Sequence, residues 1–156
     1  MNVHLREITA DTVRQINLLD VKPEQQGLVA RNSESLAQAL FSPEAWYRAI
    51  YEGDEPAGFV MLYDETLRAV PPAQPQAYVW RFMVDAKFQG RGIGAAALDQ
   101  AIAHVRAKGV FASLFVSYVP RPGSPEGFYL RAGFRHTGRL DEGEVVLELP
   151  LSPRAD

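Results

Sequence analysis

Residues 89–94 read Gln89-Gly90-Arg91-Gly92-Ile93-Gly94 and separate two stretches of different character. The nearly continuous apolar run at 77–84 predicts a central β-strand, and the helical periodicity of 92–108 predicts an amphipathic helix. Glycines at such a junction expose backbone N–H groups, and a helix N-terminus adds unpaired donors with a partial positive charge. This glycine loop (residues 89–94) therefore predicts a binding site for a phosphate or pyrophosphate group.

The rest of the chain alternates between strand-like and helix-like stretches. Thr9 is expected to cap the first helix and Gly109 to end the third. The order predicts a mixed sheet with helices on its faces, an α+β (α/β mixed) fold in a single domain spanning residues 1–156. We expect strands at residues 3–8, 46–51, 57–63, 77–84, 110–116, 134–139 and 144–149, and helices at residues 10–19, 33–41, 92–108 and 125–132.

Composition excludes several classes of protein. The 156 residues carry a net charge of −3 without a basic patch, so we expect no nucleic-acid partner. No signal sequence and no apolar run of about 18 residues is present, so we expect no membrane span and a cytoplasmic location. Cysteine is absent, which excludes disulfides, thiolate metal sites and a covalent cysteine mechanism. His4, His104 and His136 are scattered, so we expect no metal.

A nicotinamide dinucleotide is the first alternative ligand for the glycine loop. Residues 90–95 fit the pattern Gly-x-Gly-x-x-Ala, which is typical of dinucleotide-binding folds. Those folds need an acidic residue at the end of the next strand, about 20 residues on, to bind the ribose. The expected strand at 110–116 and Ser117 after it contain no carboxylate, so the sequence disfavours this alternative.

Two motifs together resemble the GNAT superfamily of N-acetyltransferases. The glycine loop resembles the acetyl-CoA pyrophosphate motif, and Phe128-Tyr129 with Gly133-Phe134 resembles the later segment of that superfamily. The resemblance implies a GNAT-like single domain with a mixed, mostly antiparallel sheet of six to seven strands flanked by about four helices. Three further stretches resemble the bacterial diamine (spermine/spermidine) acetyltransferase-like subgroup, namely residues 81–90, 58–61 and 137–146.

The resemblance also implies how acetyl-CoA, the cosubstrate, is bound. Strand 77–84 is expected to diverge from the following strand, leaving a gap in which pantetheine pairs with the strand's backbone, while the pyrophosphate lies on the glycine loop. Many relatives have an Asn in the loop matching residues 120–125; this chain has none, and Ser124 or backbone groups take its place. The implied cofactor-binding residues are Phe82, Met83, Val84, Gln89, Gly90, Arg91, Gly92, Ile93, Gly94, Ala95 and Ser124.

Tyr129 matches the general acid of the superfamily, which protonates the departing thiolate after direct attack by an amine. A free tyrosine has a pKa of roughly 10 and a reference thiol of roughly 8.5, so complete transfer is uphill by about 2 kcal/mol. Either the nearby helix N-terminus lowers the pKa of Tyr129, or its hydroxyl only donates a hydrogen bond to the sulfur.

The acceptor is the least determined part of the site. We expect the acceptor to be a primary amine of a small molecule, a diamine or polyamine, with an aminoglycoside, an amino acid or a protein N-terminus as alternatives. A non-catalytic acetyl-CoA sensor and a homodimer are also compatible with the resemblance. The general base is open between Glu24, Glu34, Glu142, Glu144 and a chain of waters. The candidate substrate-binding residues are Glu24, Glu34, Trp80 and Glu142.

Overall fold

A seven-stranded sheet with the order β1-β2-β3-β4-β5-β7-β6 forms the centre of the computed structural model, which describes residues 1–151. All neighbouring strands are antiparallel except β4 and β5, which are parallel. The strands are β1 (Val3–Arg6), β2 (Ala45–Glu52), β3 (Glu55–Asp64), β4 (Ala77–Val84), β5 (Ser113–Tyr118), β6 (Arg135–Asp141) and β7 (Glu144–Pro150). Among the described residues the α-helices are α1 (Val13–Leu18), α2 (Asn32–Ala39), α3 (Ile93–Ala107) and α4 (Glu126–Arg131).

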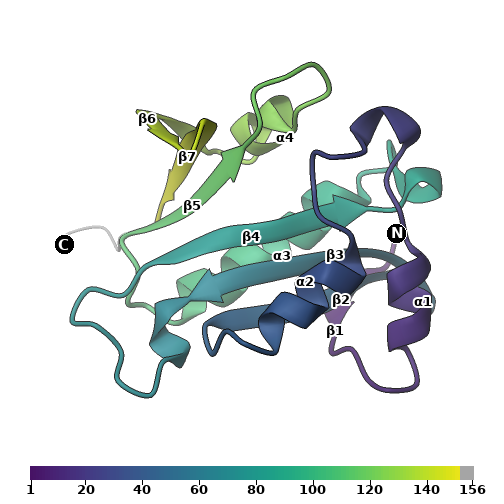
Figure 1. The fold of residues 1–156 in the computed structure, drawn as a ribbon, viewed down its shortest axis with the longest axis horizontal. Helices are drawn as coiled ribbons and strands as arrows, with labels where there is room; N and C mark the ends of the chain where they lie inside the picture. The colour runs from purple at the N-terminus through teal and green to yellow at the C-terminus, as the bar shows by residue number, and fades with distance from the viewer. Residues whose placement is uncertain (152–156) are drawn as a thin grey trace.

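The helices cover both faces of the sheet, as the sequence predicted. In Figure 1, α3 runs behind β3 and β4, while α1 and α2 lie in front of them. α4 lies beside β5, near the end at which β5 separates from β4. The described residues confirm the predicted α+β architecture; residues 152–156 of the predicted single domain lie outside them.

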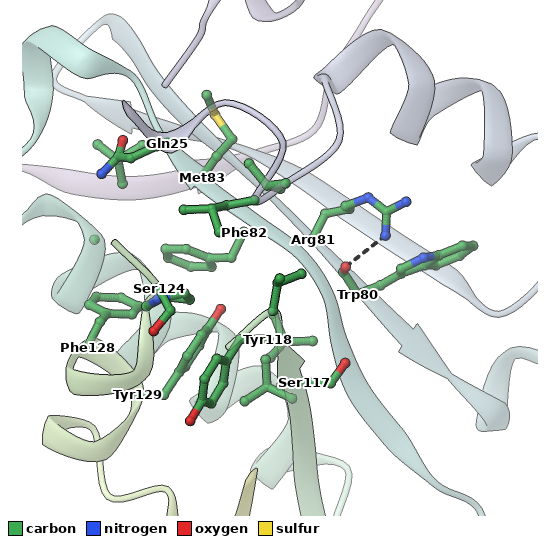
Figure 2. Close-up of a pocket in the computed structure, with 18 of the residues that line it drawn as sticks. Gln25, Trp80, Arg81, Phe82, Met83, Ser117, Tyr118, Ser124, Phe128 and Tyr129 are labelled. Carbon is green, nitrogen blue, oxygen red and sulfur yellow. Dashed lines mark hydrogen bonds between the residues drawn. The ribbon is translucent and has the colours of Figure 1, made fainter. Parts of the chain in front are cut away.

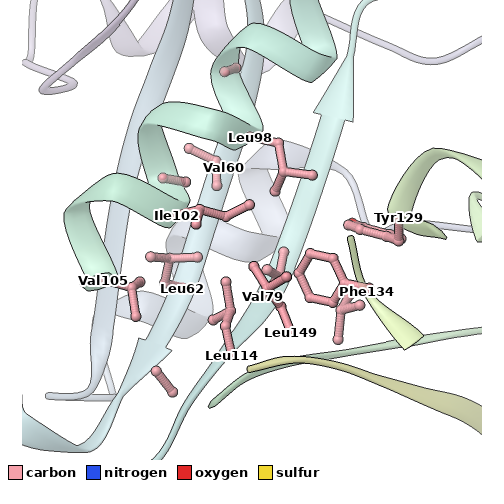
Figure 3. Close-up of a cluster of buried hydrophobic side chains, with 14 of the residues drawn as sticks. Val60, Leu62, Val79, Leu98, Ile102, Val105, Leu114, Tyr129, Phe134 and Leu149 are labelled. Carbon is pink, nitrogen blue, oxygen red and sulfur yellow. The ribbon is translucent and has the colours of Figure 1, made fainter. Parts of the chain in front are cut away.

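Two apolar layers hold the sheet between its helices. Side chains alternate between the two faces of each strand, so neighbouring residues of β3 and β4 enter different layers. The larger layer lies against α3, where Leu98, Ile102 and Val105 pack on the sheet as predicted (Figure 3). The smaller layer lies against α1 and α2 and includes Ile16, Phe59 and Met83. This packing makes β4 a strand covered on both faces.

β4 and β5 stay together for only three residue pairs. Ala77, Tyr78 and Val79 pair with β5, and no residue after Val79 does. β5 continues alongside β7, up to the pair of Tyr118 and Val145, so the two halves of the sheet diverge (Figure 1). The predicted gap between these strands is therefore present.

A β-bulge in β4 stands where the gap begins. Met61 of β3 pairs with Arg81 and Leu62 pairs with Val79, which leaves Trp80 as the extra residue. Bulges redirect side chains and are common next to active sites.

Several element boundaries differ from the sequence prediction, most of them by one or two residues. The strand expected at 110–116 is wrong in position: β5 begins at Ser113, because Gly109 ends the helix with a φ of 68° and the next residues lead back to the sheet. The helix expected at 10–19 begins at Val13, with Thr12 and not Thr9 at its cap position. Residues 9–12 instead form a turn in which Thr9 N–H donates to Thr12 Oγ1. The helix expected at 33–41 spans Asn32–Ala39.

Candidate active site

A cleft of about 1530 Å³ occupies the gap between β4 and β5. Its walls come from β4, β5, the glycine loop, the N-terminal end of α3, α4 with the loop before it, the α1–α2 loop (residues 19–31) and the β6–β7 hairpin. Figure 2 labels lining residues that come from β4, β5, α4, the α1–α2 loop and the loop before α4. One end of the cleft holds the glycine loop, and the other holds a group of charged and aromatic side chains. Most of the site residues predicted from the sequence line it.

The backbone of β4 offers unpaired groups to the cleft. Asp85 N–H donates to Ala57 O at 2.8 Å, and the antiparallel register continues with Val84 opposite Gly58 and Met83 opposite Phe59. Hydrogen-bonded and non-bonded pairs alternate in such a ladder. The backbone of Met83 therefore bonds to β3, while that of Phe82 and Val84 points into the gap. Phe82 presents both its N–H and its C=O there, whereas Val84 presents only its N–H, because Val84 O accepts a hydrogen bond from Gln89 Nε2.

The glycine loop requires glycine at two positions. Gly90 and Gly92 have φ values of 77° and 81°, in the left-handed region that other residues adopt only with strain. Gly92 is also the N-cap of α3, so the first free N–H groups of the helix follow it. A Cβ atom at Gly94 would lie 3.3 Å from the Phe128 ring, so this helix start is packed closely against α4. Ile93 is buried under the loop, and Ala95 is exposed in the cleft wall.

Two polar side chains of the glycine loop have partners within the protein. Gln89 Nε2 donates to Val84 O at 2.9 Å and to Gln25 Oε1 at 2.7 Å. Arg91 lies 3.7 Å from Glu52 and over the Phe88 ring, and it is not among the residues that line the cleft. Gln89 thus stabilises the loop. Arg91, which the sequence predicted to bind the cofactor, lies outside the cleft.

The α1–α2 loop joins the two sides of the cleft. On the β4 side, Gln25 Nε2 donates to Gln89 Oε1 at 3.1 Å. On the β5 side, Arg121 donates to Gln26 O at 2.5 Å. Ser124 lines the cleft from the loop before α4, with its backbone N–H bonded to Arg121 O. The loop therefore bridges the open end of the gap.

Tyr129 projects from α4 into the cleft. Its ring is packed edge-on against Phe128 and Phe134, with centroids 5.2 Å and 5.4 Å away, and only 4% of the residue is exposed. In Figure 2 its hydroxyl points toward the middle of the cleft, whereas that of Tyr118 points the opposite way. Burial raises the pKa of Tyr129 well above its ordinary value. The sequence-based option that a helix N-terminus lowers this pKa is wrong, because desolvation dominates.

The far end of the cleft combines carboxylates with aromatic faces. Tyr78 and Trp80 of β4 line it, and Tyr63 stacks on Tyr78 with centroids 4.6 Å apart. Exposed Glu34 reaches the cleft from α2, and Asp141 and Glu144 reach it from the β6–β7 hairpin. Such an arrangement attracts ammonium groups, through Coulombic attraction and cation–π contact.

Two predicted substrate residues lie elsewhere. Glu24 is exposed in the α1–α2 loop, and Glu142 is exposed in the tip of the hairpin with a φ of 50°; neither lines the cleft. In the same hairpin, Asp141 and Glu144 pair across the two strands and line the cleft, whereas Glu142 lies at the tip between them. Sequence reasoning also missed Arg81, although a charge inside an otherwise apolar strand is a signal that was available.

The Acetyltransferase (GNAT) family profile matches residues 10–134, which include the glycine loop, β4 and Tyr129. The chain belongs to the GNAT acetyltransferase family. It is therefore an N-acetyltransferase that uses acetyl-CoA, and the confirmed gap, the free backbone of β4 and the glycine loop fit this donor. The family assignment therefore disfavours both alternatives from the sequence, a nicotinamide-dinucleotide ligand and a non-catalytic acetyl-CoA sensor.

Individual relatives of this GNAT acetyltransferase cover nearly its whole length. It is 28% identical over 163 residues to the spermine/spermidine N(1)-acetyltransferase of Bacillus subtilis strain 168, covering 94% of this chain and 97% of that protein. It is 30% identical over 135 residues to the L-2,4-diaminobutyric acid acetyltransferase of Streptomyces anulatus, covering 80% and 73%. The PaiA N-acetyltransferase of Thermoplasma acidophilum, solved with coenzyme A, has the same fold, with a TM-score of 0.71 at 14% identity over 96% and 99% of the chains.

Neither a cluster of metal-binding side chains nor a membrane-spanning helix is found in the described part of this acetyltransferase. Within residues 1–151, no group of three or more His, Cys, Asp or Glu side chains is placed to hold a metal ion. No helix in the same part of the chain is long and apolar enough to cross a bilayer.

Proposed function

We propose that this acetyltransferase acetylates a primary amine of a small molecule that carries a second amino group, a diamine or polyamine. The observation that carries the proposal is the far end of the cleft, which is lined by the carboxylates of Glu34, Asp141 and Glu144 and by the aromatic side chains of Tyr78 and Trp80. One amino group of such an acceptor is acetylated, and a second, still protonated, binds the carboxylates and aromatic faces.

The distant relatives support this choice of acceptor. The Bacillus subtilis relative is named for spermine and spermidine, and the Streptomyces anulatus relative for L-2,4-diaminobutyric acid. All three compounds carry at least two amino groups. An acceptor with a single charge, or a bulky aminoglycoside, has no such support.

The proposed reaction is direct transfer. The neutral amine nitrogen forms a bond to the acetyl carbon, the carbon–sulfur bond breaks, the nitrogen loses one proton and the sulfur gains one. The products are an N-acetylated amine and the free thiol of CoA. The chain has no cysteine, which agrees with a route that involves no thioester on the protein.

Tyr129 assists the departure of the sulfur. Because burial raises the pKa of Tyr129, its hydroxyl keeps its proton throughout the neutral range. A neutral hydroxyl that points into the cleft donates a hydrogen bond to the negative charge developing on sulfur. The proton then reaches the thiolate from the hydroxyl or from water.

Glu144 is our candidate for the group that takes the proton from the amine. It lines the cleft at the end of β5, where its Oε1 accepts a hydrogen bond from Ser117 Oγ at 3.1 Å. An alkylammonium has a reference pKa of about 10.4, so a carboxylate or a water held by it must assist deprotonation. Glu24 and Glu142, outside the cleft, do not suit this role.

Thiol release from acetyl-CoA, measured with a panel of acceptors, tests the proposal. The panel contains putrescine, spermidine, an aminoglycoside, a monoamine and a peptide with a free N-terminus. We expect kcat/KM to be at least about ten-fold higher for acceptors with two amino groups on a short chain than for the monoamine. Equal or higher activity with the monoamine or the peptide would refute the assignment of the far end of the cleft to a second ammonium group.

A further inference from the structure

Arg81 is the single charged residue inside β4. The β-bulge turns Arg81 and Trp80 toward α2, because Trp80 packs with Met83 in the smaller apolar layer and Arg81 Nη2 donates to Gln38 Oε1 of α2 at 2.9 Å. Arg81 Nη1 donates to Trp80 O at 3.0 Å (Figure 2). Arg81 is also one of the residues that line the cleft, two positions beyond Val79, the last residue of β4 that pairs with β5.

The charge of Arg81 has no anion in contact with it. Within residues 1–151, no carboxylate oxygen lies within 4.0 Å of its nitrogens, and its Nε is buried without a hydrogen-bond partner. Glu34 and Glu144 act on it only from a longer distance, and burial lowers the pKa of the guanidinium. Partly desolvated cations in proteins are normally paired with an anion, because an unpaired buried charge is costly.

We propose that Arg81 binds a carboxylate of the acceptor, so that the substrate is a diamino acid and not a simple diamine. This inference rests on the proposed acetylation of a small acceptor with a second amino group, and it narrows that acceptor to one that also carries a carboxylate. A guanidinium is planar and binds carboxylates through two parallel hydrogen bonds. Two of the five N–H groups of Arg81 are used by Trp80 and Gln38, which leaves donors on both terminal nitrogens.

The far end of the cleft carries both negative and positive side chains, as the recognition of a diamino acid requires. Three carboxylates, from Glu34, Asp141 and Glu144, suit an ammonium group, and Arg81 suits a carboxylate. A simple diamine carries only positive charge, so it would leave the guanidinium unpaired and would be repelled by it. A diamino acid pairs with both kinds of group at once.

Matched pairs of acceptors that differ by one carboxylate test this inference. The pairs are L-2,4-diaminobutyrate with 1,3-diaminopropane, L-ornithine with putrescine, and L-lysine with cadaverine. For at least one pair we expect the wild-type kcat/KM to favour the diamino acid at least about ten-fold. Arg81→Gln should remove most of this preference by raising KM for the diamino acid, with the value for the diamine changed less than about three-fold.

Two further variants separate recognition from structure. Gln38→Ala removes the hydrogen bond to Arg81 but keeps the guanidinium, so the preference should persist. Arg81→Lys keeps the charge without the planar pair of donors, so an intermediate preference is expected. Thermal unfolding shows whether each variant is folded. A folded variant should also keep the wild-type affinity for CoA, because Arg81 lies outside the glycine loop.

Calorimetric titration of the same acceptors in the presence of CoA distinguishes failure of this inference from failure of the proposed function. Selective binding of a diamino acid that depends on Arg81, without turnover, would support the inference and refute the proposed acetylation. Turnover that favours the diamine in every pair, or an equal effect of Arg81→Gln on both members, would refute the inference and leave the proposed function standing. If no diamino acid is either bound or turned over, the inference is refuted as well.

Discussion

Gln25 and Gln89 exchange two side-chain hydrogen bonds, at 2.7 Å and 3.1 Å, although 64 residues separate them. Gln89 also holds Val84 O, so one amide connects the α1–α2 loop, the glycine loop and the free edge of β4. The α1–α2 loop is thereby connected to the glycine loop, which we expect to bind the phosphates of acetyl-CoA. Order in one of these loops supports order in the other.

Gln25→Ala should weaken acetyl-CoA binding without unfolding the protein. Two hydrogen bonds are lost, each contributing about 1 kcal/mol, while the bond from Gln89 to Val84 O remains. We expect KM for acetyl-CoA to rise roughly five-fold or more in steady-state kinetics. Gln26→Ala is the matched control, because among residues 1–151 the Gln26 side chain bonds only within the α1–α2 loop, to Asp20 and Val21. Equal effects of the two variants would show that the link to Gln89 does not matter.

Tyr129→Phe should lower kcat roughly 100-fold and leave the dissociation constant of acetyl-CoA nearly unchanged. The ring stays packed against Phe128 and Phe134, so thermal stability should also be retained. Because the pKa of Tyr129 is raised, its ionisation should not reduce activity between pH 7 and about pH 10. Tyr118→Phe is the control, since that hydroxyl points away from the middle of the cleft (Figure 2). A Tyr129→Phe enzyme with normal kcat would remove this hydroxyl from the mechanism.

Gly92→Ala should raise the dissociation constant of acetyl-CoA at least about ten-fold, measured by calorimetry. Within the protein a Cβ here meets only the Met1 methyl at 3.6 Å, so the main obstruction falls on the bound phosphates. The residue also has a φ of 81°, and alanine costs roughly 1 kcal/mol there. Gly109→Ala, at a φ of 68° in open space at the other end of α3, carries the same strain and should leave CoA binding unchanged. A normal affinity of Gly92→Ala would place the phosphates elsewhere.

His104 should make the protein less stable in mild acid. Its ring stacks on Trp46 at 4.1 Å, and its Nε2 is buried without a hydrogen-bond partner in the described chain. Burial lowers its pKa below the ordinary 6.5, and the charges of Lys108 and Arg48 add to this. Between the lowered value and 6.5 the unfolded chain binds more protons than the folded one, so stability falls as pH falls through this window.

Thermal unfolding at about pH 7.5 and about pH 5.5 measures the effect of His104. His104→Phe keeps an aromatic ring on Trp46 and removes the titrating group, so the loss of Tm on acidification should become smaller than in the wild type. If His104→Phe loses as much Tm on acidification as the wild type, His104 does not carry the acid sensitivity.

Local sequence was sufficient for most of the fold but not for the acceptor end. The apolar run of β4 and the periodicity of α3 are encoded in consecutive residues, so both were predicted closely. β5 was placed too early because Val110 and Phe111 resemble strand residues, although they belong to the connection after α3.

The residues missed at the site depend on register and on distant contacts. Glu142 was chosen over Asp141 because the tip of a hairpin cannot be fixed without knowing which residues pair. The orientation of Arg81 depends on a bulge, and the partner of Gln89 is far away in the chain. None of these three relationships can be recognised from the residues next to each other in the sequence.

Simultaneous measurement of released thiol and acetylated amine, with mass spectrometry of both the amine and the protein, tests the central claim most directly. Direct transfer through the cleft predicts one N-acetylated amine for each thiol released, no release without an amine, and no acetyl group on the protein. Thiol release that is independent of the amine, or an acetylated protein that precedes the product, would contradict this account.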